Sequence, residues 1–223
     1  MKVTYIHHSC FLVETDCCYY LFDYEKGTFP ALNTEKPIYV FSSHGHHDHY
    51  QEKIFSILKD LGMQSIFGIL SDDIACPPEA AHLSVSPGRS YTLPLGQTLT
   101  TLKSTDLGVA FLLEEQGLLI YHAGDLNDWV WEEESASYNE QMTLDYRKQI
   151  DLLSQKLAGR KIHLAFVVLD PRQEKDYARG MRYFLENIHA EQVFPMHYWG
   201  NPGIIQTFLQ EHPEYQTQIS MTE

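Results

Sequence analysis

The segment from Ile38 to Tyr50 constrains this chain more than any other. Ile38–Phe41 is an apolar run of β-forming residues, and it leads directly into SSHGHHDHY. Four side chains that can bind a metal follow within six positions: His44, His46, Asp48 and His49. A loop at the end of a strand can turn successive side chains toward one point while the sheet fixes its root. Imidazole and carboxylate suit Zn²⁺, Fe²⁺ or Mn²⁺, so the segment predicts a metal site.

The remaining hydrophobic pattern predicts a mixed α/β chain. Short apolar runs between polar turns predict strands at Val3–Ile6, Phe11–Glu14, Tyr19–Phe22, Ile38–Phe41, Gln64–Ile69, Ser90–Leu93, Thr98–Leu102, Val109–Glu114, Leu118–His122, His163–Leu169 and Gln192–Pro195. Helical spacing predicts helices at Lys53–Leu61, Asn139–Leu157, Glu174–Ile188 and Pro202–Gln210. Leu70–Arg89 is a loop-rich stretch. We expect one domain over residues 1–223, an α/β (α+β) fold with two sheets facing each other and helices outside.

Composition restricts the kinds of molecule that this chain is expected to bind. The formal net charge of −14 weighs against a protein whose main task is to hold nucleic acid, because that affinity comes largely from Lys and Arg. The N-terminus lacks the features of a signal peptide, and the longest apolar stretch, Leu164–Leu169, is too short to span a bilayer. We therefore expect a cytoplasmic protein with a small-molecule substrate and no membrane partner. The oligomeric state stays open.

Four motifs together resemble one family. His44–His49 fits the HxHxDH motif of the metallo-β-lactamase superfamily. Tyr121–Asp125, with the sequence YHAGD, looks like the later strand-end "GD" element, and Pro195–His197 looks like the late histidine after a buried strand. Leu21–Asp23 is similar to the end of the opening hairpin. The branch that these motifs resemble is the lactonase-like group, which includes L-ascorbate-6-phosphate lactonase.

The resemblance implies a four-layer αββα sandwich and a two-metal site. His44 and His46 would bind the first metal, and Asp48, His49 and His197 the second. Asp125 would bridge the two ions. A metal-bound hydroxide would be the nucleophile, and Asp48 would accept or deliver a proton. Zn²⁺ is the expected ion, one or two per chain, with Mn²⁺ and Fe²⁺ as alternatives.

One ligand of the family pattern is missing. The third histidine of the first metal usually lies about twenty residues before the GD element, but Leu102–Val109 contains no histidine. Asp106 could replace it as an oxygen ligand, which would favour Fe or Mn. Alternatively, one firm metal would remain, or His122 or His8 would fill the position. We favour Asp106, and we expect His82 to lie too far away.

Four further residues are candidates for substrate binding, and each has a structural alternative. His8 is preferred over His7, because only one of two alternating side chains can face the site. His122 precedes Asp125 and could instead be a buried histidine bonded to backbone. Trp129 could wall a substrate pocket or anchor its loop. Arg172 could hold an anionic group of the substrate or form a structural salt bridge.

These features predict a metal-dependent hydrolase of a small-molecule ester, lactone or phosphoester. A phosphodiesterase or nuclease of the same fold is an alternative, and it should have a basic groove beside the metals. A metal-binding protein without turnover is a third hypothesis, since a missing ligand is also what a decayed site would show.

Overall fold

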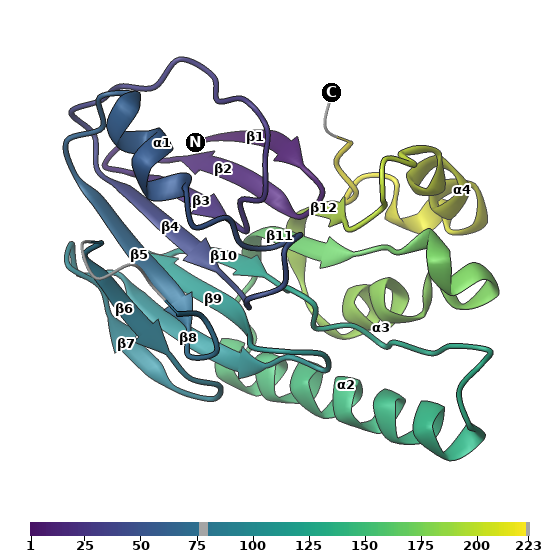
Figure 1. Cartoon of the computed structure of the whole chain (residues 1–223). Coiled ribbons are helices and arrows are strands. Elements are labelled where there is room, and N and C mark those ends of the chain that lie inside the picture. Colours follow the sequence, from purple (N-terminus) through teal and green to yellow (C-terminus); the bar gives the residue numbers. More distant parts are fainter. Residues whose placement is uncertain (76–79, 222–223) are drawn as a thin grey trace. The chain divides into compact units, whose positions relative to one another are not determined.

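The computed structural model describes residues 1–75 and 80–221, and its secondary structure forms two compact units (Figure 1). The first unit is Met1–Ser86 and the second is Pro87–Met221. Residues 76–79, which belong to the predicted loop-rich stretch Leu70–Arg89, lie outside the described residues.

The first unit contains a six-stranded sheet with the strands in sequence order. Its strands are β1 (Lys2–His7), β2 (Cys10–Glu14), β3 (Tyr19–Phe22), β4 (Ile38–Ser42), β5 (Ile66–Ser71) and β6 (His82–Val85). The first two pairings are antiparallel and the next three are parallel. The carboxyl ends of β3 and β4 therefore meet at one edge, where the turn between β1 and β2 also lies.

A hydrophobic core fixes the root of the histidine-rich loop. Helix α1 (Ile54–Asp60) buries Ile54, Phe55 and Leu58 among apolar side chains of β2, β3, β4 and β5. All five residues of β4 are buried. A strand covered on both faces reads as a continuous apolar run, which is why Ile38–Phe41 predicted it correctly.

The second unit contains another six-stranded sheet, in the order β12-β11-β10-β9-β8-β7. Its strands are β7 (Ser90–Thr92), β8 (Thr98–Lys103), β9 (Val109–Glu115), β10 (Leu118–His122), β11 (Ile162–Val168) and β12 (Ala190–Met196). The three strands from β10 to β12 are parallel, and the others are antiparallel. The carboxyl ends of β10, β11 and β12 consequently share an edge with the loop between β8 and β9.

Helices of the second unit pack beside its sheet. Helix α2 (Ala136–Leu157) begins after Ser135, whose hydroxyl accepts a hydrogen bond from the backbone of Tyr138. The helix contacts β8 and also α3 (Arg179–Asn187), which contacts β11 (Figure 1). Helix α4 (Gly203–Glu211) and two 3₁₀ turns, Pro171–Asp176 and Pro213–Tyr215, complete the unit. None of the described helices is long and apolar enough to cross a bilayer.

Two predicted elements differ from the structure. The predicted helix Glu174–Ile188 begins too early, because α3 begins at Arg179 and Glu174 adopts a φ of 51° that kinks the preceding 3₁₀ element. Strand β6 lies inside the stretch that was predicted as loop. Its sequence HLSV has one fully buried residue, so the hydrophobic pattern was too weak to reveal a short edge strand.

The close approach of α3 to the loop after β10 requires a glycine. A Cβ atom at Gly180 would lie 1.8 Å from Oδ1 of Asn127. We predict that Gly180→Ala lowers the free energy of unfolding by about 1–3 kcal/mol through overpacking, measured by urea denaturation. The matched control is Gly203→Ala at the first position of α4, where the nearest atom is an Asn201 side-chain oxygen at 3.3 Å. Equal effects of the two substitutions would contradict this account.

Candidate metal centre

The first unit gathers its candidate ligands at the edge where β3 and β4 end. His44–His49 follows β4, Asp23 follows β3, and His8 occupies the turn between β1 and β2. His8 and Asp23 have positive φ angles of 49° and 45°. Such angles are uncommon outside glycine and cost free energy, and they concentrate at functional sites.

Asp23 organises this cluster. It is fully buried, and its two carboxylate oxygens accept hydrogen bonds from the backbone and the hydroxyl of Ser43, each at 2.7 Å. Nδ1 of His49 lies 2.8 Å from Oδ2 of Asp23 and donates to it. This bond fixes the tautomer of His49 and leaves Nε2 as the nitrogen that could bind a metal.

The first two motif histidines converge in the same way. The hydroxyl hydrogen of Ser43 is given to Asp23, so Nδ1 of His44, at 3.0 Å from that oxygen, acts as the donor. Nε2 of His44 then lies 3.0 Å from Nδ1 of His46. The backbone N–H of Gly45 donates to Asp73 at 2.7 Å, which holds the loop between the two rings.

A second group in the same unit comprises His8, Asp48 and His49, whose potential ligand atoms lie within 4.8 Å of one another. Oδ2 of Asp48 is 3.5 Å from Nε2 of His8 and 3.8 Å from Nε2 of His49. His47 is different, because its side chain is 90% exposed. His47 therefore projects into solvent, whereas the neighbouring Asp48 and His49 are partly or fully buried.

The second unit presents its candidates at the carboxyl edge of β10, β11 and β12. Asp125, Asp170 and His197 follow these three strands. Nε2 of His197 lies 3.4 Å from Oδ1 of Asp125. Asp106 comes from the loop between β8 and β9, and its nearest carboxylate oxygen lies within 4.8 Å of one from Asp125. Three predicted metal ligands thus lie together within this unit.

Asp170 accepts a hydrogen bond from Nδ1 of His197, just as Asp23 accepts one from Nδ1 of His49. It is fully buried, and its Oδ2 accepts from Nδ1 of His197 at 2.9 Å and from Nε1 of Trp199 at 3.3 Å. Arg172 donates to it through Nε and Nη2. Burial raises the pKa of Asp170, but the hydrogen bonds from His197 and Arg172 outweigh it and lower the pKa to about 2. The carboxylate therefore stays ionised and accepts the Nδ1 hydrogen of His197. This bond leaves Nε2 of His197 facing away from Asp170.

Thr105 holds the loop between β8 and β9 in place. Its hydroxyl donates to the backbone carbonyl of Asn127 at 2.6 Å and accepts from the backbone N–H of Asn127 at 3.0 Å. The next residue, Asp106, is exposed, and its backbone N–H donates a hydrogen bond to the hydroxyl of Ser104. Thr105 therefore holds the loop that carries the candidate ligand Asp106.

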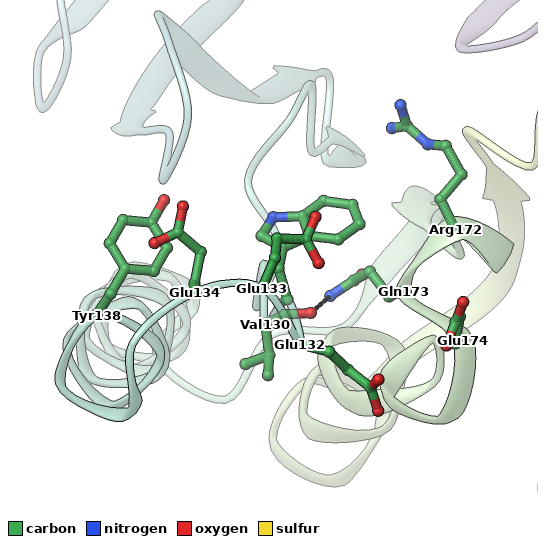
Figure 2. A pocket seen from close by; sticks show the side chains of 9 residues that line it. Val130, Glu132, Glu133, Glu134, Tyr138, Arg172, Gln173 and Glu174 are labelled. Carbon is green, nitrogen blue, oxygen red and sulfur yellow. Dashed lines mark hydrogen bonds between the residues drawn. The ribbon is translucent and has the colours of Figure 1, made fainter.

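A cavity of about 170 Å³ in the second unit opens beside these carboxylates. Its lining comprises Thr105, Asp106, Asp125, Trp129, Trp131, Tyr138, Met142 and Arg172. Trp129 lines this cavity, and its Nε1 donates to the carbonyl of Asp125 at 2.9 Å. A second cavity, of about 600 Å³, shares Trp131, Tyr138 and Arg172 with the first (Figure 2).

His122 and His82 lie apart from these groups. His122 is fully buried, and its Nδ1 accepts the backbone N–H of Gly124 at 3.1 Å, as expected for a histidine bonded to backbone. His82 lies in β6, with Nδ1 2.8 Å from the carbonyl oxygen of Ala80. Neither belongs to a potential metal group among the described residues.

Sequence reasoning missed the partner of His197. From the sequence, Asp170 had no predicted role, whereas in the structure its carboxylate accepts a hydrogen bond from Nδ1 of His197. Backbone strain also marks this edge, since His197 and Trp199 have φ angles of 64° and 48°. No local pattern predicts either feature.

Comparison with solved structures identifies the class of fold. The structure is similar to that of Igni18, a metallo hydrolase from the archaeon Ignicoccus hospitalis, with a TM-score of 0.66 and 18% identity over 99% of this chain and 94% of that one. CmlA, a diiron beta-hydroxylase from Streptomyces venezuelae, gives 0.60 and 11% over 99% of this chain and 52% of that one. The short form of human tRNase Z gives 0.52 and 13% over 97% and 90%. The predicted metallo-β-lactamase fold class is confirmed.

Residues 2–140 match the model of the beta-lactamase superfamily domain, and the chain belongs to that superfamily. A search of curated proteins found no match. The chain thus has a metallo-hydrolase fold with candidate metal-binding residues. The donor chemistry fits a metal, because His49 and His197 each direct Nδ1 to a buried carboxylate, as metal-bound histidines do.

Removing the carboxylate behind His49 should weaken metal binding. We predict that Asp23→Asn lowers the affinity for Zn²⁺ about 10–100-fold, because His49 loses its orienting acceptor. Competition with a chromophoric chelator measures this affinity. Asp72→Asn, the same change at an exposed position of the same unit, should leave it unaltered. An unchanged affinity in Asp23→Asn would contradict the role given to this carboxylate.

Asp170 should contribute pH-dependent stability. Its pKa in the folded chain is below the reference value of 3.8, so its contribution is complete above pH 4 and is lost as the pH falls toward 2. In chelator-treated protein, the free energy of unfolding of wild type should exceed that of Asp170→Asn by about 2 kcal/mol more at pH 5 than at pH 2. Exposed Asp145→Asn should show no such pH-dependent difference, and a constant difference for Asp170→Asn would contradict the prediction.

Proposed function

We propose that this protein is a metal-dependent hydrolase of a small-molecule ester, lactone or phosphoester. The observation that supports it most strongly is the pair of buried carboxylates, Asp23 and Asp170, each bonded to Nδ1 of a histidine. Burying a charged carboxylate costs free energy unless hydrogen bonds compensate it, and here some of the compensating bonds orient imidazoles that suit a metal.

We further propose one catalytic domain over residues 1–223 with two metal-binding positions. His44, His46 and Asp106 hold the first ion, and Asp48, His49 and His197 hold the second, with Asp125 shared between them. The close approach of His44 to His46, of His49 to Asp48, and of His197 to Asp125 within their own units supports these sets. Zn²⁺ is the proposed ion because imidazoles predominate.

When bound, the ions lower the pKa of water and polarise the substrate oxygen under attack. Asp48 is the residue that accepts and delivers the proton. It is partly exposed, and its Oδ2 lies 3.5 Å from Nε2 of His8, so His8 can hold this carboxylate in position. Trp129, with its indole anchored to the carbonyl of Asp125, excludes water from one side of the substrate.

The cavities of the second unit favour a small molecule over nucleic acid. Arg172 is the one cationic side chain that lines either of the two described cavities, while Glu132, Glu133, Glu134 and Glu174 line the larger. A polynucleotide would need a basic groove to neutralise its phosphates. We therefore propose a metabolite as the substrate and the cytoplasm as the location.

Metal content and hydrolysis test this function together. We predict two Zn²⁺ per chain in protein purified without chelator and one in Asp106→Ala, measured by elemental analysis. The wild-type protein should hydrolyse at least one of a set of nitrophenyl esters, aromatic lactones and bis(4-nitrophenyl) phosphate. Chelation should abolish the rate, and added Zn²⁺ should restore it.

Asp145→Ala, an exposed change on α2, is the matched control and should retain both ions. One ion in both wild type and Asp106→Ala would mean that Asp106 binds none and that Asp48, His49, Asp125 and His197 carry the chemistry alone. Metal binding without hydrolysis of any member of the set, or faster cleavage of a labelled RNA, would contradict the proposed function.

A further inference from the structure

Arg172 is held more rigidly than an ordinary surface arginine. Its Nε and Nη2 donate to Asp170 at 2.5–3.0 Å, and its guanidinium carbon lies 4.4 Å from the ring centre of Trp199 and 5.9 Å from that of Trp131. A guanidinium bound on one edge and packed against aromatic rings has little conformational freedom left to lose. Yet its side chain is 48% exposed.

The bonds of Arg172 leave one recognition edge for a ligand. A guanidinium has five N–H groups, and Asp170 accepts from the Nε side. Both N–H groups of Nη1 and one of Nη2 remain, and no described residue accepts a hydrogen bond from Nη1. These groups form the end-on edge that binds a carboxylate through two parallel hydrogen bonds.

This edge belongs to the cavities beside the metal-binding carboxylates. Arg172 lines the smaller cavity together with Asp106, Asp125 and Trp131, and it lines the larger one as well. In Figure 2 its side chain extends away from Gln173 and Glu174, on the side of the cavity opposite Tyr138 and Glu134. One ligand can therefore reach the guanidinium, the indole of Trp131 and the reacting end of the site.

The surrounding charges select among anions. Asp170 already offsets part of the positive charge of Arg172, and exposed Glu133, Glu134 and Glu174 line the adjoining cavity. A dianion would meet stronger repulsion from these carboxylates than a monoanion would. These charges together favour a singly charged carboxylate over a phosphate monoester as the ligand of Arg172.

We propose that the substrate carries a carboxylate that binds end-on to Arg172, with its apolar part against Trp131. This inference rests on the proposed function, since it names the substrate class of the same site. Arg172 is then the residue that determines specificity, and the carboxylate lies away from the bond that is hydrolysed.

Equilibrium binding of matched probes tests the proposal without turnover. We expect the Zn²⁺-loaded protein to bind 2-naphthoate, measured by calorimetry, and Arg172→Gln to weaken this binding about tenfold or more. Arg172→Lys should restore only part of it, because an ammonium lacks the paired edge. The neutral 2-naphthamide should bind weakly and equally to wild type and to Arg172→Gln.

Two variants separate charge recognition from general effects. Trp131→Leu should weaken naphthoate and naphthamide by the same factor, because both present the same ring system. Arg160→Gln is the matched control: its side chain is also 48% exposed and also forms an ion pair in the second unit, with Glu114. It should leave naphthoate binding unchanged.

Three outcomes would overturn the inference. Naphthoate affinity that is equal in wild type and Arg172→Gln would remove Arg172 from recognition. An equal loss of naphthamide would show that the substitution acts through the fold. Tighter, Arg172-dependent binding of 2-naphthyl phosphate would assign the site to phosphate instead of carboxylate. Absence of any hydrolysis with intact Arg172-dependent naphthoate binding would defeat the proposed function and leave this binding site standing.

Discussion

The site depends on the burial of a carboxylate behind each of two histidines. Asp23 and Asp170 are both fully buried, and a buried charge is tolerated only when hydrogen bonds replace its lost hydration. Asp23 receives two such bonds from Ser43 and one from His49, and Asp170 receives them from His197, Arg172 and Trp199. Each carboxylate thereby fixes one tautomer and one ring orientation, which are the conditions for a metal-binding Nε2.

The backbone is strained at Asp23 and His197, and the free energy of the strain is offset by the sheets that hold the preceding strands. Among the described residues, Asp23 and His197 adopt positive φ at the point where a buried strand ends. Each strand is paired on both sides or packed in a core, so it fixes the residue before the bend. Strain of this kind persists only where the surroundings overdetermine it.

Sequence alone could predict the strands and the local motif, but not the long-range pairs. His44–His49 is contiguous and follows a fully buried strand, so the sequence predicts both its place at a strand end and its ability to bind a metal. The bond between Asp170 and His197 joins residues 27 positions apart, and nothing at either position indicates the other. The bond between Asp23 and His49 likewise joins residues 26 positions apart. The break at Glu174 escaped prediction because helical spacing continues through it, and only φ reveals the kink.

The position of Asp106 in its loop also follows from local forces. Thr105 ties the loop to Asn127 through two short hydrogen bonds, and this contact places Asp106 where its carboxylate lies within 4.8 Å of that of Asp125. Two carboxylates so close repel each other in the absence of a cation. A dication relieves that repulsion, so an aspartate here couples the stability of the loop to metal binding more tightly than a neutral imidazole would. With Asp106, the proposed first position offers two imidazoles and two carboxylates, counting Asp125, and the proposed second position offers the same number of each. An aspartate at this position would therefore make the two proposed positions alike in donor chemistry, which supports the same kind of ion at both.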